Sequence, residues 1–264
     1  MGALAHRAGT GGAEIRVADG QRSLVPRGSG MVGLRLERLT VVGVCTKLNL
    51  QVRAGSVRAA VVRDQPSVDV LADVIVGLHK PSNGRVFVDD TVVSQQHTDH
   101  RRHRKHRLNH QQSRQCGIRL VPADGWLEPQ RTVFDHILQA QCPTAPATED
   151  ATKTVQETVS AFGLEPIAER RPEHLTPTER QLLGLARAMC WKPSAVVLED
   201  APGQPTWDAV FEDRRRRVRR TEHVGVPDPP VPHPFVAMLI ITTDAARVRQ
   251  LDDDPVGVEP GGVR

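Results

Sequence analysis

The sequence contains no tyrosine, and aromatic residues make up only 3% of its 264 residues. Single-stranded nucleic acid is usually bound by stacking on aromatic side chains, so this composition disfavours that class of protein. The sequence also lacks a run of about 18 apolar residues, so no transmembrane helix is expected. Its N-terminus has no apolar region of the kind that a signal peptide requires.

Paired cysteines are absent as well. Cys45, Cys116, Cys142 and Cys190 lie far apart, and none of them forms a C-x-x-C motif. Neither a zinc site nor a disulfide framework is therefore expected, and four reduced thiols in a cytosolic protein are the simpler interpretation. The formal net charge of +4 is a small excess that does not by itself indicate a nucleic-acid partner.

Aliphatic residues are plentiful, and the chain is long enough to bury a sizeable core in one large or two small domains. Residues 1–30 are rich in Gly, Ala and Arg without periodicity, which predicts a disordered leader. Within it, LVPRGS at residues 24–29 resembles a thrombin cleavage site, as in a remnant of an expression vector. Met31 would then be the natural start of a folded domain at residues 31–264.

The hydrophobic pattern predicts both strands and helices. Period-two alternation in residues 33–52 indicates two short strands in an antiparallel arrangement. An apolar stripe at i, i+3, i+4 and i+7 predicts a helix that begins near Val68. Further strands are expected at 57–62, 82–90, 118–122, 195–200 and 237–244, and further helices at 132–141, 154–162 and 178–189. Alternating strands and helices indicate an α/β fold with a largely parallel central sheet.

Five strings in a fixed order resemble the framework of one family, the ATP-binding cassette of ABC transporters. They span about residues 33–244 and read GSVRAAVV with IVGLHKPSNGRVFVDD, then IRLVPADGWLEPQRTVFDHIL, LTPTERQLLGLARAM, KPSAVVLED and IITTD. The resemblance implies a P-loop-type ABC cassette with a mixed central sheet and N-terminal antiparallel strands. It also implies a helical subdomain inserted at about residues 128–192.

The resemblance further implies a phosphate-binding loop for ATP and Mg²⁺ within VVRDQPSVDVL, residues 61–71. Such a loop uses glycines to turn backbone N–H groups toward the phosphates, a lysine for their charge and a hydroxyl for Mg²⁺. Here Val68 stands at the lysine position and Asp69 at the hydroxyl position, and Pro66 removes an N–H donor. Ser67 remains the candidate cofactor contact, and a capped helix start without a ligand is the alternative.

The family's signature segment, L-S-G-G-Q, corresponds to LTPTE at residues 175–179. Thr176 and Thr178 are candidate cofactor contacts across a cassette dimer because they carry hydroxyls in this segment. The same residues also make a favourable helix start, with a threonine cap followed by an early glutamate. Both interpretations stay open at this point.

The family's acidic motif corresponds to Glu199 and Asp200, which follow an apolar strand. Glu199 is the candidate Mg²⁺ ligand, and Asp200 is the candidate catalytic base that would polarise water. Aspartate is shorter than the usual glutamate at that position, which would slow hydrolysis. Solvated acids at a strand end are the alternative. Ala123 and Thr243 replace the family's loop glutamine and switch histidine.

Two basic tracts and a proline-rich stretch complete the pattern. Residues 100–110, HRRHRKHRLNH, are compatible with a solvated insertion, with contact to a polyanion or with a metal site. Residues 214–220, RRRRVRR, indicate a solvated helix face, and residues 226–234 a linker.

The sequence therefore predicts an ABC-transporter ATP-binding-type subunit with a degenerate site and weak or absent ATP hydrolysis. The resemblance implies permease subunits and a second cassette as partners, and a peripheral position on the cytoplasmic face of the membrane. Three alternatives remain: a non-catalytic pseudo-cassette that supports an intact one, a basic nucleic-acid-binding protein, and a drifting gene product without a selected function.

Overall fold

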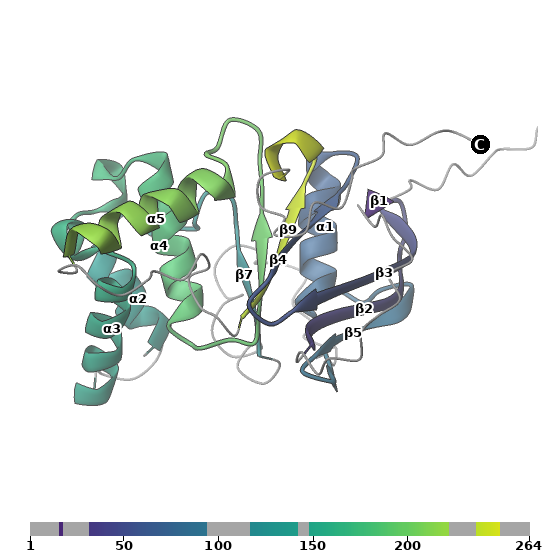
Figure 1. The fold of residues 1–264 in the computed structure, drawn as a ribbon, viewed down its shortest axis with the longest axis horizontal. Helices are drawn as coiled ribbons and strands as arrows, with labels where there is room; N and C mark the ends of the chain where they lie inside the picture. The colour runs from purple at the N-terminus through teal and green to yellow at the C-terminus, as the bar shows by residue number, and fades with distance from the viewer. Residues whose placement is uncertain (1–15, 18–31, 94–116, 142–147, 222–235, 249–264) are drawn as a thin grey trace, which may run out of the picture.

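A computed structural model describes residues 16–17, 32–93, 117–141, 148–221 and 236–248 (Figure 1). Two β-sheets and five α-helices make up this part of the chain. The His/Arg-rich tract, the proline-rich stretch, Cys116 and Cys142 lie outside the described residues. In the described part, no helix has both the length and the apolar character needed to cross a bilayer.

The smaller sheet is antiparallel and has the strand order β3-β2-β5-β6. Its members are β2 (Val32–Val41), β3 (Cys45–Arg53), β5 (Asn83–Val88) and β6 (Thr91–Val92). The predicted N-terminal pair is thereby confirmed. The register between β2 and β5 shifts near Arg38, where Gly84 has a φ of +88°. A Cβ at Gly84 would lie 2.4 Å from the Arg38 carbonyl oxygen, so only glycine fits there.

The larger sheet has the order β1-β4-β9-β8-β7. Its strands are β1 (Arg16–Val17), β4 (Val57–Val61), β7 (Ile118–Val121), β8 (Ala195–Glu199) and β9 (Ala237–Thr242). Neighbouring strands among β4, β9, β8 and β7 pair in parallel, whereas β1 pairs antiparallel with β4. The two residues of β1 belong to the segment predicted as a disordered leader.

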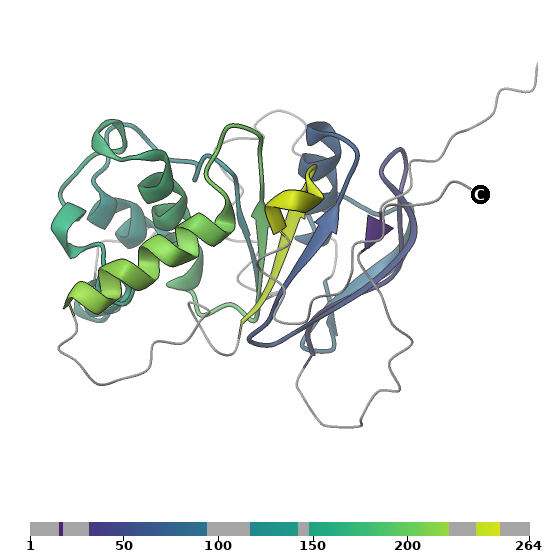
Figure 2. The ribbon, with the colours of Figure 1, turned by 45° about the horizontal axis from the view of Figure 1, so that its top comes forward.

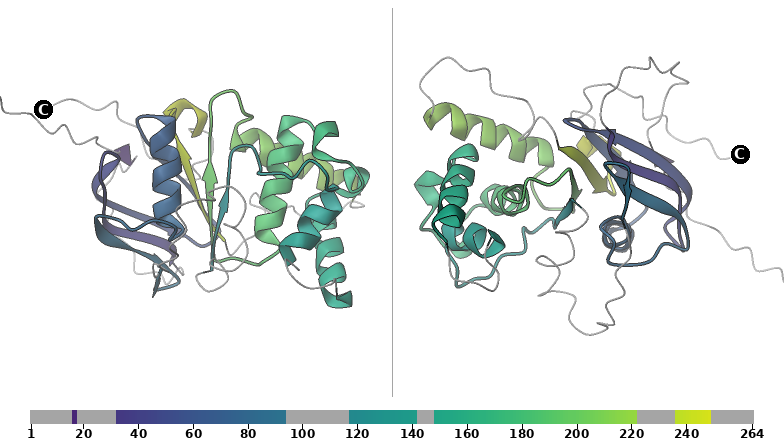
Figure 3. Two further views of the ribbon diagram at one scale, coloured as in Figure 1. Left: turned by 180° about the vertical axis from the view of Figure 1, so that it is seen from behind. Right: turned by 90° about the horizontal axis from the view of Figure 1, so that it is seen from below.

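Both faces of the parallel sheet are covered, which explains why its strands read as continuous apolar runs. Along β8, Val196 and Leu198 join the core formed with the helical part. The alternate residues, Ala195 and Val197, join the core formed with α1 and the antiparallel sheet. Figures 1 and 3 show this order of layers, with the helical group, the parallel sheet, α1 and the antiparallel sheet following one another.

Five α-helices occupy two places. Helix α1 (Gln65–Ile75) lies between the two sheets, and the other four lie together beyond β7, with α5 crossing the group in Figure 2. These four are α2 (Val133–Gln141), α3 (Glu149–Ala161), α4 (Pro177–Met189) and α5 (Trp207–Thr221). Short 3₁₀ helices are η1 (Glu165–Ile167), η2 (Pro172–His174) and η3 (Ala245–Val248).

The arginine run in α5 is only partly the solvated face that the sequence predicted. Arg214 is 6% exposed, and its guanidinium lies 5.4 Å from the centre of the Phe162 ring. Arg217 binds Asp213 on its own helix and Glu179 on α4. The run therefore joins α5 to its neighbours in addition to presenting charge to solvent.

Candidate functional site

The carboxyl ends of β7 and β8 open onto a cleft of about 310 Å³ beside α1. A crevice at the carboxyl ends of parallel strands is the usual ligand position in open α/β sheets. Residues from α1 and from the segments that follow β7 and β8 line the cleft: Gln65, Asp69, Asp73, Leu120, Pro122, Ala123, Asp124, Trp126, Glu199, Ala201, Pro202 and Gln204.

The charged lining of this cleft is acidic. Asp69, Asp73, Asp124 and Glu199 contribute four carboxylates, and among the described residues that line it there is no lysine, arginine or histidine. Beside the cleft, the ring of His79 lies 3.3 Å from the buried carboxylate of Asp73. An anionic ligand such as a triphosphate would meet repulsion in this cleft, and a cation would meet attraction.

The N-terminus of α1 is closed by its own cap. Asp64 is the N-cap, and its Oδ1 accepts hydrogen bonds from the Ser67 backbone N–H (3.0 Å) and the Ser67 hydroxyl (2.5 Å). These bonds, first of all that from the hydroxyl, hold the pKa of Asp64 below its usual range. The predicted phosphate contact Ser67 thus already uses both donors inside the chain.

The backbone before α1 also differs from an anion-binding nest. A nest aligns consecutive N–H groups by alternating right-handed and left-handed conformations. No described residue from 62 to 69 has a positive φ. The segment has the geometry of a capped helix start, which was the alternative interpretation of this loop, and the cap is Asp64.

The two predicted acids at the end of β8 have different surroundings. Glu199 lines the cleft, and its backbone carbonyl accepts a hydrogen bond from the Trp207 indole N–H at 3.0 Å. Asp200 is 3% exposed and does not line the cleft. The Thr242 hydroxyl donates to Asp200 Oδ2 at 2.7 Å, and Arg247 binds both oxygens, with Nε 2.7 Å from Oδ2 and Nη2 2.8 Å from Oδ1.

Arg247 extends this contact to the segment that follows β8. Its Nη2 also donates to the carbonyl of Gln204 at 2.8 Å, and hydrogen bonding with Asp200 raises the pKa of Arg247. The charge of the candidate catalytic base is therefore compensated within the chain. To accept a proton from water, Asp200 would first have to leave this ion pair.

The loop after β7 supplies another wall of the cleft. Ala123, at the position of the family's glutamine, is buried and has no side-chain donor or acceptor. Asp124 Oδ1 accepts a hydrogen bond from the Trp126 backbone N–H at 3.0 Å, as expected of a turn residue. Trp126 lines the cleft and has a φ of 52°.

The signature-like segment forms the start of α4. Thr176 is the N-cap, and a capping box joins it to Glu179: the Thr176 N–H donates to Glu179 Oε2 at 2.8 Å, and the Glu179 N–H donates to the Thr176 hydroxyl at 3.2 Å. Glu179 also accepts from Arg217 Nη2 at 2.9 Å. Burial opposes its charge, yet these hydrogen bonds keep the pKa of Glu179 below its usual range.

The structure does not bring the predicted site residues together in one place. Glu199 lines the cleft, whereas Ser67, Asp200, Thr176 and Thr178 do not. Within the described ranges no group of three or more His, Cys, Asp or Glu side chains is arranged to hold a metal ion.

Three residues that shape this region were not singled out from the sequence. Asp64 could have been found from the sequence, because an aspartate just before a helix is a usual N-cap whose side chain accepts from the N–H three residues on, here that of Ser67. Asp73 is a buried polar residue of α1, and the apolar pattern that predicted this helix does not report buried polar residues. Arg247 is 47 residues from Asp200, and no local pattern reports such a contact.

Comparisons with known proteins agree with this architecture. The model of the ABC transporter family matches residues 70–202. The methionine import ATP-binding protein MetN of Rhodopseudomonas palustris is 27% identical over 222 residues, which cover 82% of this chain and 53% of that protein. The lipoprotein-releasing system ATP-binding protein LolD of Idiomarina loihiensis is 22% identical over 210 residues, covering 80% of this chain and 84% of that protein.

Solved structures give the same fold. The structure of cbiO1 from Clostridium perfringens, part of the ABC transporter complex cbiONQ, superposes with a TM-score of 0.63 at 16% identity. The match covers 84% of this chain and 82% of that one. The chain spans only about half the length of the MetN relative.

Proposed function

The chain belongs to the ABC transporter family, and from this premise we propose that it is an ATP-binding-type subunit with a degenerate site that hydrolyses ATP weakly or not at all. The ion pair between Asp200 and Arg247 is the observation that carries the proposal. In this ion pair Arg247 binds the carboxylate of Asp200, the residue at the position of the family's catalytic base.

The residues at the cleft do not fit the triphosphate of ATP. Val68 is fully buried in the helix, so the lysine position presents no charge to a ligand. Asp64 already accepts from the N–H and hydroxyl of Ser67, and Asp69 adds a carboxylate to the lining. Phosphate binding at a helix N-terminus depends on free N–H groups and a favourable dipole, and this helix start supplies an anion of its own.

The residues do not fit Mg²⁺ coordination either. Magnesium in nucleotide sites is held by one or two carboxylates together with substrate phosphates. Glu199, the last residue of β8, lines the cleft, and the hydroxyl position is an aspartate. Since the phosphates that would complete the coordination are disfavoured, the described residues of the cleft offer the metal an incomplete set of ligands.

The start of α4 supports the same conclusion for a site shared between two cassettes. In the capping box the Thr176 N–H donates to the Glu179 carboxylate, and the Glu179 N–H donates to the Thr176 hydroxyl oxygen. Pro177 has no N–H to offer. A γ-phosphate presented by a second subunit would have to break the cap before it gained these donors.

The proposed role is that of a non-catalytic member of a transporter assembly. The subunit would pair with an intact cassette and dock against permease subunits on the cytoplasmic face, with the intact cassette supplying the ATPase activity. The paired state of several α5 arginines favours this role over nucleic-acid binding, because Arg215, Arg216 and Arg217 are already bound to acidic side chains.

Phosphate release is the direct test of the missing activity. The purified chain with millimolar Mg·ATP should release phosphate no faster than a buffer blank. Affinity purification of the chain from its native membrane should also recover an intact cassette or a permease subunit. Turnover that is clearly above the blank and is lost in an Asp200→Asn variant would contradict the proposal.

A further inference from the structure

The loop that follows β7 lies between the acidic cleft and α4. On one side, Pro122, Asp124 and Trp126 line the cleft. On the other side, Pro122 and Gly125 line a small cavity against α4, with a volume of about 20 Å³. A single water needs roughly 10–15 Å³, so this cavity leaves the loop little room to shift toward the helix. This wall of the cleft is therefore packed closely against α4.

The face of α4 that contacts the loop carries Arg180, Gly184 and Arg187. Their spacing of four and then three residues places them on one side of the helix. A Cβ at Gly184 would lie 3.0 Å from the Gly125 Cα, and a Cβ at Gly125 would lie 2.5 Å from the Arg180 carbonyl oxygen. Glycine at both positions therefore lets the two backbones approach more closely than another residue would allow.

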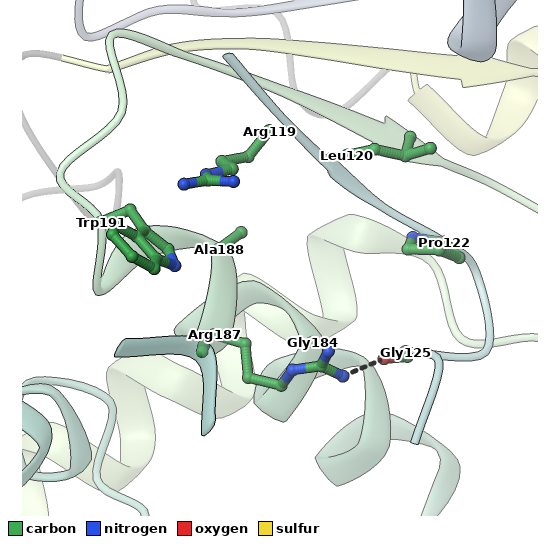
Figure 4. A pocket seen from close by; sticks show the side chains of 9 residues that line it. Arg119, Leu120, Pro122, Gly125, Gly184, Arg187, Ala188 and Trp191 are labelled. Atoms are coloured by element: carbon green, nitrogen blue, oxygen red, sulfur yellow. Dashed lines mark hydrogen bonds between the residues drawn. The ribbon is translucent and has the colours of Figure 1, made fainter. Parts of the chain in front are cut away.

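Arg187 binds the loop from this face of α4. Its Nη1 donates to the carbonyls of Gly125 at 3.2 Å and Trp126 at 2.7 Å, and Figure 4 shows the guanidinium pointing toward Gly125. Gly125 has a φ of +75° and Trp126 a φ of 52°, so two successive residues adopt the left-handed conformation. That conformation is unfavourable for a residue with a side chain and persists only where the surroundings impose it. The two hydrogen bonds from Arg187 supply such a constraint at Trp126.

A separate contact joins β7 itself to the end of α4. The guanidinium of Arg119, on β7, lies 4.8 Å from the centre of the ring of Trp191, two residues beyond α4. Figure 4 shows the side chains of Arg119 and Arg187 on opposite sides of Ala188. Helix α4 and its end therefore hold both the strand and the loop that follows it.

We propose that α4 locks residues 122–127 in a single conformation, as a conformational device built into this fold. The loop and α4 then move as one unit. The wall of the cleft shifts only when the contact with Arg187 is broken or when α4 itself is displaced. The lock concerns the shape of the cleft, so it stands independently of the proposed loss of ATP hydrolysis.

Hydrogen–deuterium exchange of the full chain, followed residue by residue by NMR, tests the proposal. The Gly125 N–H donates to the Pro122 carbonyl at 2.9 Å. The Trp126 N–H donates to Asp124 Oδ1 at 3.0 Å, so exchange at both amides requires the loop to open. Arg187→Met removes two hydrogen bonds from a charged donor and should accelerate exchange at both amides roughly 10- to 100-fold. Exchange at the native rate in this variant would overturn the proposal.

Arg180→Met is the matched control for this measurement. It makes the same substitution on the same face of α4, but Arg180 contacts the loop through its backbone carbonyl, which the substitution keeps. Both loop amides should therefore exchange within about twofold of the native rate. If Arg180→Met accelerated exchange as much as Arg187→Met, the effect would belong to α4 in general, and a lock made by the Arg187 side chain would be excluded.

Gly184→Ala tests the lock without removing a hydrogen-bonding group. Its Cβ would lie 3.0 Å from the Gly125 Cα, so the loop has to move away from α4, while alanine favours the helix itself. In protein labelled with fluorotryptophan, the native chain should give one sharp fluorine NMR resonance for Trp126, assigned by its loss in Trp126→Phe. This resonance should shift or split in Gly184→Ala. An unchanged resonance in that variant, or several Trp126 resonances in the native chain, would contradict the proposal.

Discussion

Arg247 binds both carboxylate oxygens of Asp200, with Nε 2.7 Å from Oδ2 and Nη2 2.8 Å from Oδ1. Asp200 is 3% exposed, so the arginine is the counterion of a buried charge. The sequence predicted Asp200 as the acid that would polarise the attacking water, whereas in the structure its carboxylate is held in this ion pair. The contact joins the segment after β8 to the segment after β9.

Removing the arginine should be costly for stability. Arg247→Gln leaves the Asp200 carboxylate buried without its counterion and should lower the free energy of unfolding by about 3 kcal/mol. Urea denaturation measures this loss. The double variant Asp200→Asn/Arg247→Gln should lose less than the sum of the two single variants. Arg216→Gln, at an exposed pair with Glu212, should lose at most about 0.5 kcal/mol.

The two threonines of the signature-like segment should behave differently. Thr176→Ala removes the N-cap of α4 and should lower the free energy of unfolding by about 1 kcal/mol. Thr178→Ala, two residues along the chain and outside the cap, should change it by less than about 0.5 kcal/mol. Chemical denaturation of both variants separates a structural role of this segment from a role in ligand contact. Equal losses in the two variants would exclude the capping explanation.

His136 should make stability depend on pH. It is 1% exposed, and burial lowers its pKa from 6.5 to about 4. Between pH 4 and pH 6.5, His136 therefore binds a proton in the unfolded chain but not in the folded chain. The free energy of unfolding is therefore unaffected by protonation of His136 above about pH 6.5. It falls by roughly 3 kcal/mol as the pH decreases from about 6.5 to about 4.

A pH series of urea denaturation curves measures this effect. His136→Gln, which cannot titrate and can still reach the Glu128 carbonyl, should flatten the curve between pH 6.5 and 4. His174→Gln, at an exposed histidine, should leave the slope of the native protein unchanged. A slope that persists in His136→Gln would assign the pH dependence to other groups.

Gln181 offers a stabilising substitution. It is fully buried on α4, and neither its Oε1 nor its Nε2 has a hydrogen-bond partner among the described residues. Gln181→Met has a similar shape and removes both polar atoms, so it should raise the free energy of unfolding by about 1–2 kcal/mol. Gln139→Met, which loses a hydrogen bond to Glu128, should give no such gain. Differential scanning calorimetry compares the two variants.

Periodicity predicted most of the elements, because each strand or helix buries one face of its own local sequence. Helix starts were less accurate. Helix α1 begins at Gln65 rather than near Val68, and α3 begins at Glu149 rather than at residue 154. In both cases a side chain just before the helix, Asp64 or Thr148, caps backbone N–H groups that the apolar pattern does not report.

The candidate site was less predictable than the fold. The substitutions at Val68, Asp69 and Ala123 are visible in the sequence once the family resemblance is recognised. The partner of Asp200 is not, because Arg247 reaches it only after β8 and β9 have paired. The antiparallel strand β1 likewise depends on an unused edge of β4, which is a property of the assembled sheet.

Thermal unfolding with and without Mg·ATP is the most direct test of whether this protein binds the nucleotide. A concentration of about 5–10 mM lies above the usual KM range of enzymes, which extends to about 1 mM. Ligands that bind only the folded state raise Tm in proportion to the logarithm of their concentration. The same Tm is expected with Mg·ATP as with a matched concentration of Mg²⁺ and an unrelated polyanion. A concentration-dependent rise that is specific to ATP would contradict it.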